Sequence, residues 1–581
     1  MNSLAGVVSV SGAVMMGSMS RLTGPPASPD PRYPGVLDRI DPGGLLEAAG
    51  AAGLAALRSP AVVARGLADL AAGSVSAVTA AVVRGAGGTM DGPVTPPAAA
   101  RYADPAWEGS ALWLLRQEHA LLAKALNGVA ADLDLPPPTR AKVAFLLTQL
   151  LAAAEPAHWP LTNPAVLKKA IDTGGRSVLR GARNAVRDLV TEGGPRQVPP
   201  GRFTVGTDLA ATPGAVVFRN RLIELVQYAP KTGRVHAVPM LFSPPWINKY
   251  YVMDLAPGRS LVERAVRSGH TVFMISYRNP GAELAGLTMS DYLREGPLAA
   301  LDVVADITGT ERVDVVALCL GGTLAAATAA WCAADGRQRV HSLTLLNTLL
   351  DYADPGALGV FTDAAAVDRL ERAISATGYL PAAWMKATFD ALRPADLVWG
   401  PIVSGWLMGE EPPAFDLLAW NGDSTRMPAT MHAEYLRDLY VGNRLAAGTL
   451  TLAGRRLDLG AVDVPAYVVS AEGDHIAPWA SVYAGARLLG GDVRFALSNS
   501  GHIAGVVNPP SPKSRHRVTD GPLPADPQAW RDDAVPRVAT WWDDWTPWVA
   551  ARAGELCEPP STGSAAHPAL EPAPGRYVRE S

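Results

Sequence analysis

The sequence predicts an α/β fold in which helices cover both faces of a mostly parallel, doubly wound β-sheet. Beyond about residue 200, short β-rich runs alternate with segments of helix length. Most of these runs are continuously apolar, as parallel strands buried on both faces require. The 581 residues, 48% of them hydrophobic, are enough for this core and for one or two further domains.

Six segments have the composition of buried strands. They are 235–243, 271–277, 313–318, 342–348, 466–471 and 493–498. The interval from about 355 to 460 is instead rich in helix-forming residues, Trp and Pro, and shows no clear strand pattern. Because an insertion of this size between strands usually covers a ligand site, we expect a helical cap there.

Pro/Gly-rich linkers divide the rest of the chain, and Leu and Ala recur at helical spacing before residue 190. We expect four parts. They are a poorly ordered N-terminal extension with short helices (1–100), a helical N-terminal domain (101–200), an α/β catalytic domain that contains the cap (201–556), and a poorly ordered C-terminal tail (557–581).

Composition excludes several classes of function. With 51 basic and 55 acidic side chains and no basic run, the chain has no electrostatic footprint for nucleic acid. We expect no membrane-spanning helix, because charged residues interrupt the apolar stretches near the N-terminus. Three cysteines cannot form a disulfide framework or a CxxC site, and no HxxxH or HExxH spacing occurs, so neither a disulfide scaffold nor a metal site is expected.

The segment VDVVALCLGGTLAAATAAW carries the strongest chemical signal. A buried-type strand runs into Cys319 and then directly into an Ala-rich helix, with Ala317, Gly321 and Gly322 around the thiol. A nucleophile elbow needs small neighbours, because the backbone turns sharply there, and the helix N-terminus favours a thiolate. The alternative is that Cys319 is only a small buried hydrophobic residue.

An elbow nucleophile needs an acid and a base, which follow it in that order in the α/β-hydrolase fold. Asp474 follows the strand AYVVSA, and His502 follows the strand VRFALS. Asp474 could instead only cap the next helix, and His502 could be a loop histidine without a role. His475 is adjacent to the acid and is better explained as a packing or supporting residue.

A tetrahedral intermediate at Cys319 would need two backbone N–H donors. Leu320, directly after the nucleophile, is the first candidate. The second should come from the loop after the first strand, where two prolines have no N–H, so Trp246 or Ile247 must supply it; Ile247 is our choice.

The chain resembles poly(3-hydroxyalkanoate) synthases over most of its length. The elbow ALCLGGT, the stretch WNGDSTRMPATMHAEYLRDLYVGNRL and the pair AEGDHIAPW and SGHIAGVVNPP all resemble that family. So do the N-terminal segments RYADPAW and HWPLTNPAVL and the closing APGRYV. One difference is Ala317, where the family's elbow usually begins with Gly.

This resemblance implies an α/β-hydrolase fold and a single-subunit, class I type of synthase that works as a homodimer. It implies Cys319 as nucleophile, His502 as general base and Asp474 as its partner. The expected reaction polymerises 3-hydroxyacyl-CoA, 3-hydroxybutyryl-CoA above all, with coenzyme A as leaving group and no cofactor. The expected location is the cytoplasm, at the surface of polyester granules.

Two other functions stay open from the sequence. A cysteine-dependent α/β-hydrolase, such as a thioesterase or lactone hydrolase, would share the triad and release free acid. A non-catalytic granule-binding relative would use the fold only as a surface. A C-terminal stripe of Trp541, Trp545 and Trp548 could likewise pack on the core or contact polymer.

Overall fold

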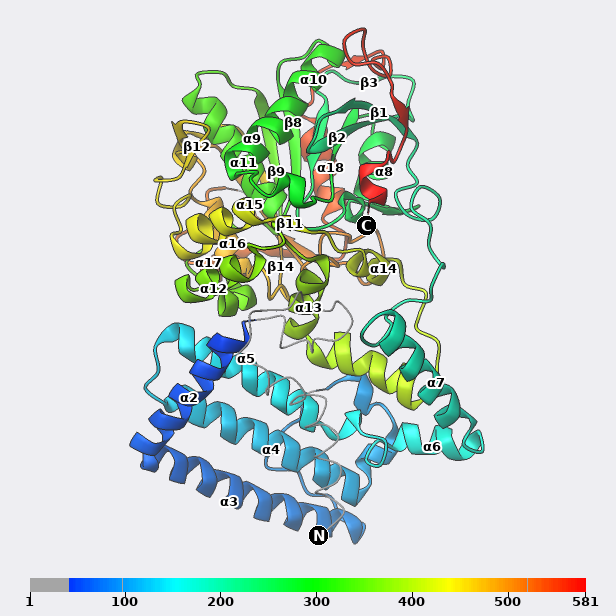
Figure 1. The fold of residues 1–581 in the computed structure, drawn as a ribbon, viewed down its shortest axis with the longest axis vertical. Helices are drawn as coiled ribbons and strands as arrows, with labels where there is room; N and C mark the ends of the chain where they lie inside the picture. The colour runs from blue at the N-terminus through cyan, green and yellow to red at the C-terminus, as the bar shows by residue number, and fades with distance from the viewer. Residues whose placement is uncertain (1–40, 97, 520, 581) are drawn as a thin grey trace. The chain divides into compact units, whose positions relative to one another are not determined.

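The computed structural model describes residues 41–96, 98–519 and 521–580, which form two compact units (Figure 1). The first unit joins the chain up to Pro199 with residues 387–413. The second joins residues 200–386 with the chain from Ala414 onward.

The first unit is helical. Its main helices are α2 (Pro42–Arg58), α3 (Pro60–Gly85), α4 (Ser110–Asp132), α5 (Pro137–Ala154), α6 (Pro164–Asp172) and α7 (Arg176–Thr191). Proline begins four of them, because its fixed φ suits the first helical position and its missing N–H is not needed there. The segment 387–413 adds the end of α13 (Ala382–Leu392) and two π-helical turns, η9 (Ala395–Trp399) and η10 (Ile402–Leu407).

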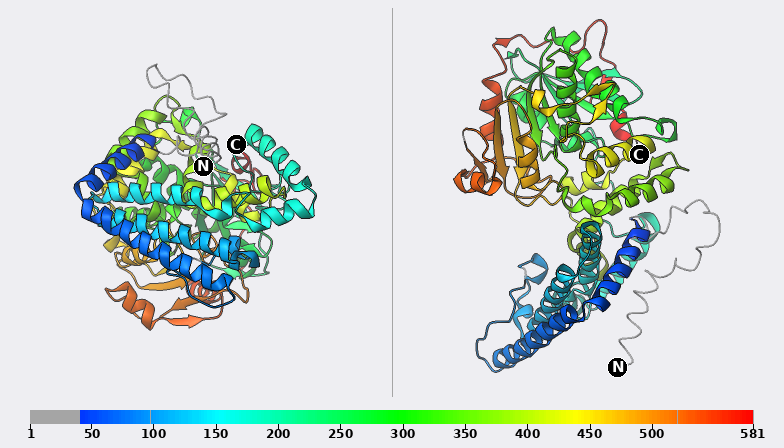
Figure 2. Two further views of the ribbon diagram at one scale, coloured as in Figure 1. Left: turned by 90° about the horizontal axis from the view of Figure 1, so that it is seen from below. Right: turned by 90° about the vertical axis from the view of Figure 1, so that its left-hand side faces the viewer.

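Helices α3 and α4 lie side by side (Figures 1 and 2). A Cβ on Gly73 would lie 2.5 Å from the end of the Leu121 side chain, so a larger residue there would require Leu121 to move. The two helices before residue 86 have 17 and 26 residues, so they differ from the short helices expected there. The expected disorder of residues 1–40 lies outside the described residues. By length and composition alone, α3 could cross a membrane, with 17% of its apolar window buried.

The second unit contains an 11-stranded sheet with the order β17-β16-β15-β14-β9-β8-β4-β7-β2-β1-β19. Its strands are β1 (Gly214–Arg219), β2 (Ile223–Tyr228), β4 (Met240–Ser243), β7 (Val272–Tyr277), β8 (Val313–Leu318), β9 (Val340–Leu346), β14 (Ala466–Ala471), β15 (Val493–Ser498), β16 (His516–Val518), β17 (Val535–Arg537) and β19 (Glu571–Pro572). The six strands from β15 to β7 in this order are parallel.

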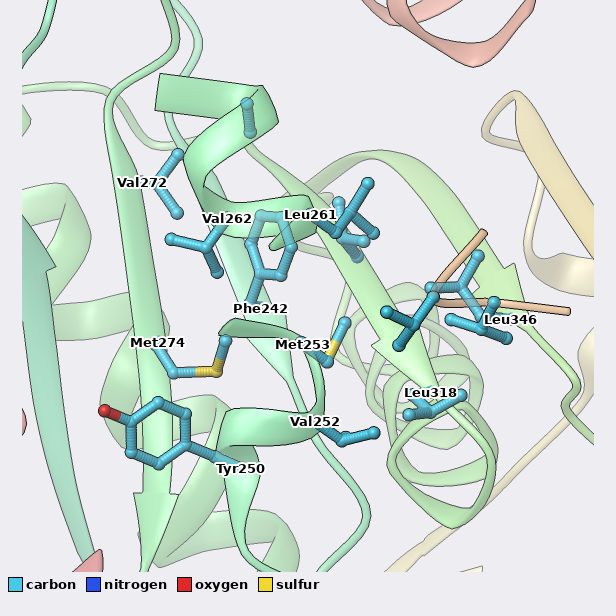
Figure 3. Packing of buried hydrophobic residues seen from close by; sticks show 14 of the residues in the cluster. Phe242, Tyr250, Val252, Met253, Leu261, Val262, Val272, Met274, Leu318 and Leu346 are labelled. Atoms are coloured by element: carbon cyan, nitrogen blue, oxygen red, sulfur yellow. The ribbon is translucent and has the colours of Figure 1, made fainter. Parts of the chain in front are cut away.

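The sheet is doubly wound from β4 outward. The chain passes from β4 to β7 toward one edge, and β8, β9, β14 and β15 then follow toward the other edge. Since such crossovers are right-handed, α8 (Leu261–Arg267) must cover one face and α10 (Ala299–Thr308), α11 (Leu320–Ala334) and α16 (Trp479–Ala486) the other. Figure 3 shows Phe242 and Met274 of the sheet packed against Val262 of α8.

Shorter elements complete this unit. The helices are α9 (Met289–Leu293), α12 (Ala364–Ile374), α14 (Asp416–Gly422), α15 (Ala429–Tyr435), α17 (Pro527–Asp533) and α18 (Trp542–Ala550). Four pairs of short strands lie outside the large sheet. They are β3 (Val235–His236) with β18 (Leu556–Cys557), β5 (Asp254–Ala256) with β6 (Arg259–Ser260), β10 (Tyr379–Leu380) with β11 (Met427–Pro428), and β12 (Thr451–Leu452) with β13 (Arg455–Arg456).

The six expected strands are present, although the first is split into β3 and β4. The sequence patterns missed the edge strands β1, β2, β16, β17 and β19. These strands carry charged or proline residues, such as Arg219, Arg517 and Pro536, and so lack the continuous apolar signal of the buried strands. Trp541 and Trp545 are fully buried, so this part of the C-terminal stripe packs on the core.

The interval expected as a cap is divided between the two units. Residues 355–386 and 414–460 belong to the sheet unit, whereas 387–413 group with the N-terminal helices. Polar side chains of α7 bind the segment 387–413. Asn184 donates to Gly405 O at 3.0 Å, and Trp406 Nε1 donates to Asp188 at 3.1 Å.

The segment expected as a C-terminal tail is integrated into the sheet unit. Strand β19 pairs with β1, and buried Glu224 accepts the backbone N–H groups of Arg576 and Tyr577 at 3.1 and 3.0 Å. Arg219 pairs with Glu224 and also with Glu571 of β19. The two residues of β19 and the buried Glu224 carboxylate therefore attach residues 557–580 to the sheet, although the composition of this segment predicts a tail.

Glu224→Gln should lower the free energy of unfolding by about 2 kcal/mol, because an amide binds the two backbone donors and Arg219 less strongly than a buried carboxylate. Urea denaturation measures the loss. The control is Glu571→Gln, whose partly exposed pair with Arg219 should contribute less than about 1 kcal/mol. Equal losses in the two variants would contradict this role for Glu224.

Candidate active site

Cys319 lies at the junction of β8 and α11, near the middle of the sheet. Its φ of 53° and ψ of −124° are strained for a residue with a Cβ, as an elbow requires. Its N–H donates to Leu346 O at the end of β9, at 2.8 Å. Ala317 is an ordinary β8 residue paired with Ser243 and Leu345, so its methyl group meets no left-handed backbone there.

The elbow is packed too tightly for side chains on its helical side. A Cβ on Gly321 would lie 2.4 Å from the carbonyl oxygens of Ser243 and Pro244, after β4. A Cβ on Gly322 would lie 1.9 Å from Thr348 Oγ1, after β9. The two glycines therefore let the start of α11 seat between the ends of the neighbouring strands.

The structure brings Asp474 and His502 together from the loops after β14 and β15. His502 Nδ1 and Asp474 Oδ2 are 2.6 Å apart, with both side chains buried. The other oxygen of Asp474 accepts the N–H groups of Ile476 and Ala477, both at 2.9 Å. The carboxylate therefore both closes its own turn and orients the imidazole.

The Cys319 side chain is near enough to His502 to act on its pKa. Burial acts to lower the pKa of His502, but the charges of Asp474 and Cys319 and the hydrogen bond to Asp474 outweigh it. The pKa of His502 is therefore held well above its usual range, which favours the protonated imidazole.

Asn347 is a residue of this site that sequence patterns missed. It follows β9 with φ 44°, a left-handed conformation that Asn tolerates better than most residues, and it is fully buried. Its Nδ2 donates to the His502 carbonyl, while its own N–H donates to Val469 O of β14 at 2.8 Å. Asn347 thus joins the loop of the base to the end of the sheet.

Three tyrosines lie near the thiol: Tyr352 and Tyr435 are buried, and Tyr440 is partly buried. Tyr352 and Tyr440 have ring centroids 4.8 Å apart, and Tyr435 lies 5.9 Å from Tyr440. Burial raises the pKa of each hydroxyl, and the charge of Cys319 raises it further, so all three stay protonated. The Tyr352 hydroxyl lies 3.0 Å from Thr323 Oγ1 on α11. These rings therefore bring three protonated hydroxyls to the neighbourhood of the sulfur.

The two expected oxyanion donors stay predictions. Leu320 is the first residue of α11, so its N–H has no carbonyl partner inside the helix. The loop that contains buried Ile247 meets the elbow through the carbonyls of Ser243 and Pro244. His475 offers its backbone carbonyl to Ala357 N–H.

The other possible reactive groups lie apart from this constellation. Cys332 is buried, and that burial raises its pKa to about 11, whereas Cys557 is exposed in β18. Within the described residues, no group of three or more His, Cys, Asp or Glu side chains could hold a metal ion. Cys319, His502 and Asp474 together can support nucleophilic acyl transfer through a covalent intermediate.

Two family models match the chain. The model described as the poly-beta-hydroxybutyrate polymerase (PhaC) N-terminus matches residues 98–265, and the α/β hydrolase fold model matches residues 247–509. The second match agrees with the sheet order and with the elbow at Cys319.

Several curated proteins are similar over most of the chain. The poly(3-hydroxyalkanoate) polymerase subunit PhaC of Cupriavidus necator is 42% identical over 487 residues, 82% of either chain. The poly(3-hydroxyalkanoate) polymerase of Methylorubrum extorquens is 40% identical and covers 87% of this chain and 85% of its own. That of Rhizobium meliloti is 39% identical, with coverage of 82% and 79%.

The rate of Cys319 alkylation by iodoacetamide, measured as a function of pH, should show a transition that reports the ionisation of His502. In Asp474→Asn this transition should move to lower pH. The reason is that loss of the negative charge destabilises the imidazolium and so lowers the pKa of His502. Glu472→Gln is the control, because this carboxylate is two residues away and pairs with Arg531 instead. An unchanged profile in Asp474→Asn would refute the coupling.

Asn347→Gly should slow the alkylation of Cys319 about tenfold at neutral pH, because the loop of His502 loses its side-chain anchor while the left-handed backbone stays accessible. Asn347→Asp should be slower still, since its carboxylate would face the His502 carbonyl. If backbone conformation alone mattered, both variants would react like the wild type.

Proposed function

The chain belongs to the poly(3-hydroxyalkanoate) polymerase family and is an acyltransferase that makes polyhydroxyalkanoate, and we propose that it does so through a thioester on Cys319. The observation that supports this mechanism is that His502, hydrogen-bonded to Asp474, also lies under the influence of the Cys319 side chain at the end of the central strands. The proposed monomer is 3-hydroxybutyryl-CoA, and no cofactor takes part.

In the first half-reaction, His502 takes the Cys319 proton and the thiolate attacks the thioester carbonyl. Leu320 N–H and a donor from the loop after β4, Ile247 in our assignment, would stabilise the oxyanion. The bond between carbonyl carbon and CoA sulfur then breaks, and CoA leaves with the proton from His502. Exchange between two thioesters is nearly balanced, so the acyl group stays activated.

In the second half-reaction, the 3-hydroxyl of another acyl group attacks the acyl-Cys319 carbonyl and gives its proton to His502. The carbon–sulfur bond breaks, and the Cys319 sulfur recovers the proton. Each cycle thus forms one ester bond and releases one CoA.

Water must not compete with the hydroxyl nucleophile. The aromatic rings of Tyr352, Tyr435 and Tyr440 near the sulfur support this requirement, because apolar ring surface leaves less room for water. We place the working protein, as a homodimer, in the cytoplasm at the surface of polyester granules.

Butyryl-CoA separates the two half-reactions, because it has the thioester but no 3-hydroxyl. We expect release of one equivalent of CoA per active site and a butyryl group on the Cys319 peptide, found by mass spectrometry. With 3-hydroxybutyryl-CoA we expect continuous CoA release and insoluble polyester. Free 3-hydroxybutyrate as the main product would indicate a hydrolase instead.

Cys319→Ala should reduce CoA release by at least about a thousandfold, with an unchanged circular dichroism spectrum and melting temperature. Cys332→Ala is the matched control, because that buried thiol lies on the same helix and has no proposed role. Retained turnover in Cys319→Ala would overturn the assignment of the nucleophile.

A further inference from the structure

Helix α7 of the N-terminal unit buries its polar face and exposes its apolar face. Its buried residues are Ser177, Gly181, Asn184 and Asp188, spaced so that they share one face. In a helix of a globular domain the apolar face is normally the buried one. The inversion requires an explanation from the contacts that hold this helix.

Those contacts are polar, specific and lie within one unit. A Cβ on Gly181 would lie 1.9 Å from Trp406 O, so the helix touches the backbone of η10. Asn184 Nδ2 donates to Gly405 O, and Asp188 accepts from Trp406 Nε1. Figure 1 shows α7 beside this segment of the cap interval. The polar face is therefore fixed inward.

The opposite face presents an apolar arc. It consists of Val178, Leu179, Val186, Leu189 and Val190, which are 40–68% exposed. At about 3.6 residues per turn, these side chains fall within about 120° of the helix surface. Neighbouring α6 also exposes apolar side chains, namely Leu167 and Ile171, the latter 78% exposed.

A basic border runs along one side of this arc. Arg176, Arg180, Arg183 and Arg187 follow one another around the helix, between the apolar arc and the buried face. Residues 164–191 contain six basic side chains against two acidic ones, and one of the acidic pair, Asp188, is buried. The exposed face is thus apolar in its middle and cationic at its edge.

Exposed hydrophobic side chains are concentrated in the same unit. Of the 24 large hydrophobic residues that are exposed in the described chain, 18 lie between residues 41 and 199. The sheet unit, although larger, exposes six. Exposed apolar surface is therefore concentrated on the N-terminal helices, and on α7 it has a cationic border.

We propose that the α6–α7 face docks on an anionic phospholipid surface, with the apolar arc in the acyl boundary and the arginines at the lipid phosphates. A neutral polyester surface would match the apolar arc but would give the basic border no partner. A second copy packed antiparallel, by a twofold axis perpendicular to α7, would set the basic border of one face against that of the other.

Flotation of the full-length protein with phosphatidylcholine vesicles, with and without phosphatidylglycerol, tests the proposal. We expect binding that requires phosphatidylglycerol and weakens with salt. The double variant Arg176→Gln/Arg183→Gln should lose about 25-fold in affinity, about fivefold per arginine. Leu179→Asp/Val186→Asp should lose more than tenfold, because charge enters the apolar arc.

The control is Val75→Asp/Val78→Asp on α3, which carries exposed apolar residues without this border. It should bind vesicles like the wild type, and the melting temperature of each variant checks folding. CoA release from a soluble substrate should stay unchanged in all three variants. This readout separates the docking surface from the proposed catalysis.

Four results would overturn the proposal. They are equal binding to phosphatidylcholine alone, loss of binding in the α3 variant but not in the α7 variants, binding to amorphous polyester particles but not to vesicles, and a change of oligomeric state in the α7 variants without any change in vesicle binding.

Discussion

The close approach of α11 to the ends of β4 and β9 is the constraint on which the rest of the site depends. Gly321 touches the carbonyls that follow β4, and Gly322 touches Thr348 after β9. Because neither position carries a Cβ, the helix can begin directly at the sheet, with Cys319 in its strained conformation. The sulfur therefore has a fixed place at the end of the central strands, and the other site residues are arranged around that point.

The remaining polar groups of the site are each engaged more than once. Asp474 uses one oxygen for His502 and the other for its own turn, and Asn347 joins the His502 loop to β14 through two bonds. Because each of these two residues makes more than one hydrogen bond, its conformation is fixed without any further charged residue. The charges of Asp474 and Cys319 both raise the pKa of buried His502, in surroundings where solvent screens charge little.

The sequence could predict what is local or ordered along the chain. A strand, a cysteine, two glycines and a helix mark the elbow, and the order of Asp474 and His502 follows from the strands before them. Asn347 could not be found in this way, because its partner is 155 residues away and its left-handed backbone leaves no pattern. The segment after Cys557 was expected to be a tail because two-residue strands and a buried Glu224 have no compositional signal.

The excursion of residues 387–413 into the N-terminal unit has a consequence for synthesis on the ribosome. The inward face of α7 finds Gly405 and Trp406 only after the elbow and the central strands have already been translated. The N-terminal helices are thus the first part of the described chain to be made, yet they are completed only after much of the sheet has emerged. Their maturation is coupled in time to that of the catalytic unit, and a fragment ending before residue 387 would leave Asn184 and Asp188 without these partners.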